Sequence, residues 1–492
     1  MANDPADDVL FEVTQGVEPP VPKTPAGRSK VFRGYDPTQS FLLPPSLDDW
    51  LPEDHTARFI AEVVDNQLDL SAIYDSYVEA TGAPPYDPSM MLKLLLLAYS
   101  TGVTSSREME RRCHVDVAFR WTTANAAPDY RSISRFRRRH LSAVDDLFTQ
   151  VLTLCSEAGL VKLGRVALDG TKLRASASRN KAMSYDRLGP KIEQLEAEVA
   201  TILAEAEATD RAEDEAFGKD QRGDEVLPEL ARRETRLAKM RAAKAAIEAD
   251  ARTKAAQKAA KKAEREGKDE TAMADAAVQA ASKAPPDKKT QRNFTDPESR
   301  MMKTADGSFH YTYNAQAVVD EGSQVVLAAA VTQQANDIDQ LIPMVEMTES
   351  NLNDAGIDDS PDVTLADAGY CSEENLQEVA DREINALVAT GRIKRGEQVP
   401  DAPRGPIPKN ATQRERMARK QRTKAGRADY ARRKAIVEPA FGQMKVRQHA
   451  GHLRLRGLAG AQGEWTLHVI CHNLRKLANA GNAATGALVG AS

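Results

Sequence analysis

The chain has 492 residues, 41% of them hydrophobic, and a formal net charge of -5 from 67 Lys and Arg against 72 Asp and Glu. This composition excludes a wholly disordered chain, and the lack of an apolar run of 18 residues excludes a bilayer-spanning helix. Four scattered cysteines without a C-x-x-C pair indicate neither a disulfide framework nor a zinc ribbon. No signal peptide is visible at the N-terminus, so we expect a cytoplasmic protein.

The net charge hides a strong alternation along the chain. Residues 101–140 carry 9 Arg against 4 acidic residues, and residues 404–434 carry 12 Lys and Arg against 2 acidic residues. Between them, residues 337–386 carry 14 acidic residues and one Arg. Solvated charged faces are the simplest interpretation of any single run. Two basic runs around an acidic block are also typical of a phosphate-binding surface around a carboxylate centre.

The first 160 residues predict an irregular arm, residues 1–50, followed by short helices. Asp87-Pro88 offers a cap for a helix over Met90–Ser100, and Ser105-x-x-Glu108 matches a capping box. Asp129 begins a third, arginine-rich helix. This pattern indicates a DNA-binding region of helix-turn-helix character, and a helical bundle with a basic face is the alternative. The candidate DNA-binding residues here are Arg131, Arg135, Arg137, Arg138 and Arg139.

A strand is predicted over Val161–Leu168, and the region that follows, residues 184–285, differs from its surroundings. Apolar residues recur in it at 3-4 spacing on both sides of a charged, Gly-containing stretch, which predicts an antiparallel coiled-coil hairpin. Strands then return at Phe309–Asp320 and Gln324–Thr332. Helices and strands alternate beyond them, which predicts an α/β fold, a mixed sheet with flanking helices.

Two predicted strands end in an aspartate followed closely by glycine, at Leu168-Asp169-Gly170 and Ala366-Asp367-Ala368-Gly369. Acids just beyond buried strands lie at the edge of a sheet, where sites form. A third acid, Glu438, lies among apolar residues of a predicted helix over Tyr430–Lys445, and its simplest role is an ion pair with Lys434. Three carboxylates also form the ligand set that Mg²⁺ prefers for phosphodiester chemistry.

Together these motifs resemble bacterial insertion-sequence transposases of the DDE type, which have a ribonuclease-H-like catalytic core. The resemblance rests on Asp169-Gly170-Thr171, on Asp367-Ala368-Gly369-Tyr370 and on Tyr430-x2-Arg433-x4-Glu438-x6-Lys445. The usual family signature has three residues between the Arg and the Glu, whereas this chain has four. Gly457-Leu458, Glu464 and Asn473 are further matches.

The resemblance implies the activity, cofactor and partners. Asp169, Asp367 and Glu438 would bind two Mg²⁺ ions, which Mn²⁺ could replace. Tyr430, Arg433 and Lys445 would hold the DNA backbone near the cut. Water would hydrolyse a phosphodiester at the element end, and the 3′-hydroxyl would then attack target DNA. Terminal inverted repeats and target DNA are the expected partners of a homodimer or higher assembly, associated with the nucleoid and not with a membrane.

The predicted domains follow from these boundaries. They are an arm (1–50), a helical DNA-binding domain (51–160), a ribonuclease-H-like domain (161–183 and 286–480), the coiled-coil insert (184–285) and a tail (481–492). A ribonuclease-H-like nuclease without strand transfer is one alternative function, and a catalytically silent DNA-binding protein derived from a transposase is another. A zinc site at His449-x2-His452 or His468-x3-His472 lacks the ligands that would complete it.

Overall fold

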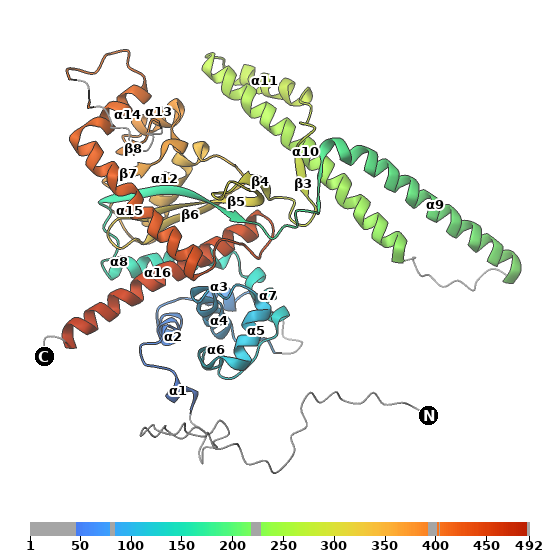
Figure 1. Cartoon of the computed structure of the whole chain (residues 1–492), viewed down its shortest axis with the longest axis horizontal. Helices are drawn as coiled ribbons and strands as arrows, with labels where there is room; N and C mark the ends of the chain where they lie inside the picture. The colour runs from blue at the N-terminus through green and yellow to red at the C-terminus, as the bar shows by residue number, and fades with distance from the viewer. Residues whose placement is uncertain (1–45, 79–83, 218–227, 392–400, 403, 490–492) are drawn as a thin grey trace, which may run out of the picture. The chain divides into compact units, whose positions relative to one another are not determined.

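The computed structural model describes residues 46–78, 84–217, 228–391, 401–402 and 404–489 (Figure 1). Most of the predicted arm, the predicted turn of the insert and the last residues of the tail lie outside this range. No helix in the described part of the chain is both long and apolar enough to cross a membrane.

The N-terminal region is helical, as predicted. Its helices are α1 (Leu47–Trp50), α2 (Thr56–Asn66), α3 (Ser71–Tyr74), α4 (Pro88–Ser100), α5 (Ser106–Val115), α6 (Val117–Thr122), α7 (Tyr130–Arg139) and α8 (Ala143–Glu157). The Asp87 side chain caps α4 by accepting from the Met90 N–H at 3.0 Å, and Asp129 caps α7 in the same way. Leu94, Leu97 and Tyr99 of α4 are fully buried, so α4 forms the centre of this region.

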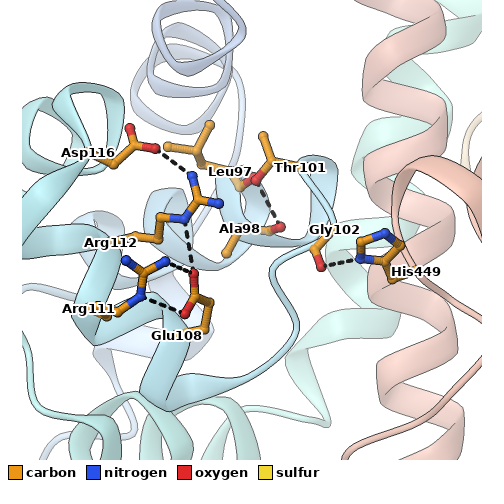
Figure 2. A network of polar contacts seen from close by, with 9 residues as sticks. All are labelled: Leu97, Ala98, Thr101, Gly102, Glu108, Arg111, Arg112, Asp116 and His449. Atoms are coloured by element: carbon orange, nitrogen blue, oxygen red, sulfur yellow. Dashed lines mark hydrogen bonds and ion pairs between the residues drawn. The ribbon is translucent and has the colours of Figure 1, made fainter.

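The predicted capping box at the start of α5 is wrong. Ser105 is the N-cap residue, but its side chain makes no capping hydrogen bond. Glu108 instead pairs with Arg111 and Arg112, and Arg112 also reaches Asp116 at 2.8 Å (Figure 2). Two guanidinium groups attract the carboxylate more strongly than one backbone N–H, and they hold the pKa of Glu108 at about 2.

The sheet begins with the strand that follows α8. Its strands are β1 (Arg165–Arg174), β4 (Arg300–Lys303), β5 (Phe309–Asp320), β6 (Val326–Thr332), β7 (Val363–Ala366) and β8 (Ala386–Val388). The order is β4-β5-β1-β7-β8, and β6 also pairs with β5. β5 is antiparallel to β1 and β6, whereas β7 and β8 run parallel to β1. The mixed sheet is confirmed, and β4 is a strand that the sequence analysis missed.

β1 differs from its predicted boundaries. The prediction ended the strand before Asp169, but β1 continues to Arg174 because its ladder with β5 extends from Val166 to Arg174. Its parallel ladder with β7 does end at Leu168, opposite Ala366. Asp169 is therefore still paired with β5, but it lies one residue beyond the last pair with β7.

Helices cover both faces of the sheet. They are α12 (Leu341–Asp354), α13 (Glu373–Asp381), α14 (Gln413–Arg422), α15 (Lys424–Arg447) and α16 (Leu458–Val489), with short 3₁₀ turns at Ile338–Gln340 and Ala368–Tyr370. α15 packs along β1, and Figure 1 shows it crossing the sheet as one helix that continues through Pro439. The Asn473 amide of α16 both accepts from and donates to the backbone of Val326 at 2.9 Å, and Gln462 bonds Val331 and Ala329. These two amides satisfy the outer edge of β6, which would otherwise be free to pair with another strand.

The insert is helical and has a small core of its own. It contains α9 (Tyr185–Phe217), α10 (Pro228–Arg265) and α11 (Glu270–Ser282), and a two-stranded sheet of β2 (Ala182–Ser184) and β3 (Gln291–Asn293) lies at its base. Its core residues are Leu188, Ile192, Leu195, Leu237, Met240 and Ile247. Most of these are the apolar residues whose spacing predicted the hairpin. The coiled-coil geometry itself stays a prediction.

Candidate active site

Asp169 and Asp367 are brought together by the register of two parallel strands. Leu168 of β1 pairs with Ala366 of β7, and each aspartate is the next residue along its strand. Neighbouring strands are about 4.8 Å apart, so the backbones of the two aspartates are side by side. Asp367 caps the following 3₁₀ turn, where its Oδ1 accepts from the Gly369 N–H at 2.7 Å. The sequence argument correctly expected two carboxylates at one edge of the sheet.

Helix α15 supplies cations to the same edge. Arg433 Nη1 donates to Asp169 Oδ2 at 3.0 Å, and Lys445 Nζ donates to the hydroxyl of Thr171, two residues further along β1. Residues two apart on a strand share a face, so α15 covers the face on which Asp169 lies. Arg433 is only 7% exposed, and its Nε has no hydrogen-bond partner.

Burial, more than neighbouring charge, disfavours the ionised form of Asp169. Burial raises the pKa of the Asp169 carboxyl, Arg433 opposes this rise, and the charge of Asp367 adds to it. The net direction is upward although a guanidinium is bound. A second cation would therefore be favoured here.

Glu438 lies on the same helix, but its surroundings differ from those predicted. It is exposed rather than enclosed by apolar residues, because Ile436, Val437 and Ala440 turn toward the core and leave Glu438 on the flank of α15. Within the described residues its carboxylate has no hydrogen-bond or ion-pair partner, so the predicted pair with Lys434 does not form. Glu438 precedes Lys445 by seven residues, which is two turns, so both lie on one stripe of α15.

A further carboxylate, Asp337, approaches from the other face of the sheet. Its Oδ1 accepts from Asn314 Nδ2 at 2.6 Å and from Gln316 Nε2 at 2.7 Å, and Lys172 Nζ is 3.7 Å away. A Cβ on Gly170 would be 2.7 Å from Asp337 Oδ1, and a Cβ on Gly369 would be 3.5 Å from Asp337 Oδ2. Gly170 thus lets Asp337 approach the backbone beside Asp169, whereas a Cβ on Gly369 would make only an ordinary contact with Asp337.

Asp337 was missed by the sequence analysis. The sequence analysis counted it only within the acidic block of residues 337–386, and it follows the polar stretch after β6. An alternating Asn314-x-Gln316 pair on a buried strand was the available signal, because two amides on one face need a buried acceptor.

The surroundings of Tyr370 show that these acids are grouped closely. Its hydroxyl donates to Gln316 Oε1, and the residue is fully buried. Burial raises the pKa of Tyr370, and the charges of Asp337, Asp169 and Asp367 raise it further. Three carboxylates from three separate segments therefore act on one side chain.

The donor chemistry of this edge fits a hard divalent cation. Carboxylate oxygens are the ligands that Mg²⁺ prefers, and it usually keeps several of its waters. Within the described part of the chain, however, no three His, Cys, Asp or Glu side chains converge closely enough to hold a metal ion by themselves. Arg433 takes the Asp169 oxygen that a metal would use. Asp169 and Asp367 are the residues that could hold it, with water or substrate oxygens completing its shell.

The arginines predicted to bind DNA fall into two groups. Arg131, Arg135, Arg138 and Arg139 are exposed on α7, and the first three are spaced i, i+4, i+7 on one face. Arg137 is only 6% exposed and donates to the Tyr99 hydroxyl at 2.8 Å and the Thr104 carbonyl at 3.0 Å. Its guanidinium has no surface to offer a phosphate, so we assign Arg137 a structural role. Tyr430 is partly buried beside Arg433, whose guanidinium lies 6.0 Å from its ring.

Two family models match the chain. Residues 45–139 match the model described as Transposase domain (DUF772), and residues 280–474 match the model described as Transposase DDE domain. The second match includes Asp337, Asp367 and Glu438 but begins after Asp169, which lies before the insert. No curated protein and no solved structure matches the chain.

Proposed function

We propose that this chain, which belongs to the insertion-sequence DDE transposases, cuts the ends of its element and joins them to target DNA. The observation that carries the proposal is the juxtaposition of Asp169 and Asp367 on adjacent parallel strands, faced by Arg433 and Lys445 of α15. The strand order of the sheet supports a ribonuclease-H-like core, because β5 runs antiparallel to both β1 and β6, and β7 and β8 run parallel to β1.

Asp169, Asp367 and Glu438 are the proposed metal ligands. Two Mg²⁺ ions held there would polarise a phosphodiester and lower the pKa of an attacking water. Within the described residues Glu438 has no other partner, and it lies on the stripe of α15 that also carries Lys445. It can therefore turn toward the edge without breaking a bond. Arg433 would exchange its hold on Asp169 for a phosphate oxygen when the metal binds.

The chain's own groups would also position the DNA. Lys445 and Tyr430 flank Arg433 on α15 and would hold the backbone on either side of the scissile phosphate. In the first step a water oxygen bonds to phosphorus while the bond to the 3′-oxygen breaks, which leaves a 3′-hydroxyl. In the second step that hydroxyl attacks a target phosphodiester and displaces its 3′-oxygen.

The remaining parts of the proposal concern recognition and assembly. The exposed arginines of α7 would bind the terminal repeats, and the domain boundaries predicted from the sequence would separate this helical region from the core. Pairing of two element ends requires at least a homodimer, and the coiled-coil insert is a candidate for that contact. A nucleoid-associated location in the cytoplasm is consistent with such a role.

An end-joining assay tests this function. Purified protein, a labelled duplex that carries the element's own terminus, a supercoiled plasmid and Mg²⁺ should yield joined products. Asp367→Asn should abolish them, whereas Asp358→Asn, an exposed aspartate before β7, should not. Cleaved ends without joined products would favour the nuclease. DNA binding without cleavage in Mg²⁺ or Mn²⁺ would favour the catalytically silent DNA-binding protein.

A further inference from the structure

A basic hollow lies at the base of the insert, away from the carboxylates. Its volume is about 620 Å³, and among the described residues no acidic side chain lines it. Four of its lining residues are cationic: Arg179, Arg187, Lys289 and Arg300. They come from the segment after β1, from α9, from the segment before β3 and from β4, so the fold gathers them from four places in the sequence.

Three of these cations are available to a ligand. Arg179, Arg187 and Lys289 are exposed, and within the described residues their side chains make no hydrogen bond or ion pair. Arg300 differs, because it donates to Gln333 Oε1 at 3.0 Å and reaches Asp250 at 3.2 Å. Arg300 therefore forms part of the wall, while the other three present uncompensated positive charge.

The rim of the hollow adds an aromatic side chain. Phe309, the first residue of β5, is 53% exposed and lines the hollow beside the cations. Unpaired cations next to an exposed aromatic ring are typical of surfaces that bind nucleic acid, where phosphates meet the charges and sugars or bases meet the ring. A free phosphate would make no use of the ring.

β5 connects this hollow to the candidate active site. Phe309 lies at one end of the strand, and Asn314, which holds Asp337, lies five residues further along. At about 3.4 Å per residue this separation is about 17 Å. DNA rises about 3.4 Å per base pair, so the hollow is about five base pairs from the carboxylate edge.

We propose that this hollow binds backbone phosphates of the DNA duplex about half a helical turn from the cleavage site, through Arg179, Arg187 and Lys289. The proposal rests on the proposed function, because it places a second contact on the DNA whose scissile phosphate lies at Asp169 and Asp367. It gives the base of the insert a role in fixing the path of the duplex rather than in spacing two domains.

Salt-dependent binding tests the hollow directly. The probe is a fluorescein-labelled duplex of about 30 base pairs of mixed sequence, and its anisotropy is measured with the full chain over a series of salt concentrations. Replacing Arg179, Arg187 and Lys289 together by Ala removes up to three phosphate contacts, so the slope of log affinity against log salt should become shallower by about 2–3. Affinity at about 0.1 M salt should fall at least about tenfold.

Two further variants make the result decisive. Arg232, Arg236 and Lys254, all exposed on α10, provide a control triple Ala variant with the same loss of charge, and its affinity should change less than twofold. Arg179→Lys with Arg187→Lys keeps the charges and should retain wild-type binding. Equal losses in the hollow and control variants would overturn the proposal, and so would a hollow variant that binds as the wild type does.

The same preparations separate this proposal from the proposed function. A wild-type protein that cleaves DNA with Mg²⁺, together with a hollow variant of unchanged slope, would overturn only the role of the hollow. A wild-type protein that fails to cleave, together with a shallower slope in the hollow variant, would contradict the proposed function and leave the DNA contact standing.

Discussion

One arginine contacts a carboxylate directly at the sheet edge, and another is linked to a carboxylate through a tyrosine hydroxyl in the core. The two pairs differ in how completely their charges are matched. Arg433 holds Asp169 at the edge of the sheet, where the Asp169 side chain is 23% exposed and Asp367 and Asp337 lie nearby. The second pair is fully enclosed between α4, α7 and α16. There Tyr99 stands between Arg137 and Glu464, and Glu464 is 0% exposed.

In the enclosed pair the protein satisfies the carboxylate, although Arg137 Nε has no hydrogen-bond partner within the described residues. Glu464 accepts from the Tyr99 hydroxyl at 3.1 Å and from the backbone N–H groups of Arg454 and Leu455 at 2.7 Å. Burial raises the pKa of Glu464, and Arg137 opposes that rise. At the edge, Asp367 has no cation bonded to it within the described residues, whereas the junction surrounds its one carboxylate with donors. An arginine beside an acid therefore indicates a functional site only where part of the charge has no bonded partner of opposite sign.

The largest expected effect is on the cleavage rate, from a substitution at the edge of the sheet. Asp367→Asn removes a charge that the proposed metal needs and leaves the side chain's size unchanged. Because metals supply several kcal/mol of transition-state stabilisation, we expect cleavage to fall at least about 10³-fold. Cleavage rates with Mg²⁺ measure this, with Asp358→Asn as the control, and thermal melting should show that both variants fold. A variant that keeps a tenth of wild-type activity would remove Asp367 from the catalytic set.

The next largest effect is on stability, from a substitution in the enclosed pair. Glu464→Ala leaves Arg137 buried without its counter-charge and two backbone N–H groups without acceptors. We expect a loss of about 3–5 kcal/mol in the free energy of unfolding, measured by urea denaturation. Asp169→Asn keeps an oxygen that can accept from Arg433, so it should cost less, about 1–2 kcal/mol. Equal losses in the two variants would mean that the two regions do not differ in the way their charges are satisfied.

The enclosed junction should also make the fold sensitive to acid. Burial and the charge of Arg137 lower the pKa of His468 to about 3, and burial lowers that of His472 to about 4. Some histidines stay neutral in the folded state but protonate near pH 6.5 in the unfolded state. Such a histidine lowers the protein's free energy of unfolding as the pH falls below 6.5. For His468 this loss is about 2 kcal/mol between pH 7 and pH 5.

Paired denaturation curves at pH 7 and pH 5 test this sensitivity. His468→Gln should lose about 2 kcal/mol less than the wild type over that interval, whatever its stability at pH 7. His114→Gln is the control, because His114 is exposed on α5, away from this junction. If His468→Gln keeps the full wild-type pH dependence, His468 is not the group that titrates.

Local patterns predicted many of the elements and the side-by-side position of two candidate carboxylates. Alternation and turn residues gave β5 as Phe309–Asp320, and Asp87 was correctly assigned as a cap. Asp169 and Asp367 were found because each follows a buried apolar run. Asp337 was missed because its partners, Asn314, Gln316 and Lys172, are brought to it only by strand pairing.

The arginines of α7 were also predicted only in part, because a partner from another helix decides the role of Arg137. The sequence placed five of them in one DNA-binding set, but helical geometry turns Arg137 inward while its neighbours stay outside. The inward position could be suspected from the spacing, since Ile133 and Phe136 share that side of the helix. Only the partner on α4, Tyr99, shows that the guanidinium is bound there.

The smallest expected effect concerns the exposed face of α7. Arg135 is exposed, and within the described residues its side chain makes no hydrogen bond or ion pair, so Arg135→Ala should remove one phosphate contact and nothing from the fold. We expect the salt slope of binding to fall by about 1 and the affinity for terminal-repeat DNA to fall several-fold, with the melting temperature unchanged. Arg137→Ala is the contrasting variant, because it should lower the melting temperature and leave the salt slope of the folded protein unaltered. The reverse result, a stability loss from Arg135→Ala and a slope change from Arg137→Ala, would mean that α7 presents its other face to DNA. Arg135 and Arg137 thus differ although they lie two residues apart on one helix. The charge of Arg135 is available to a ligand, whereas the guanidinium of Arg137 is bound within the fold.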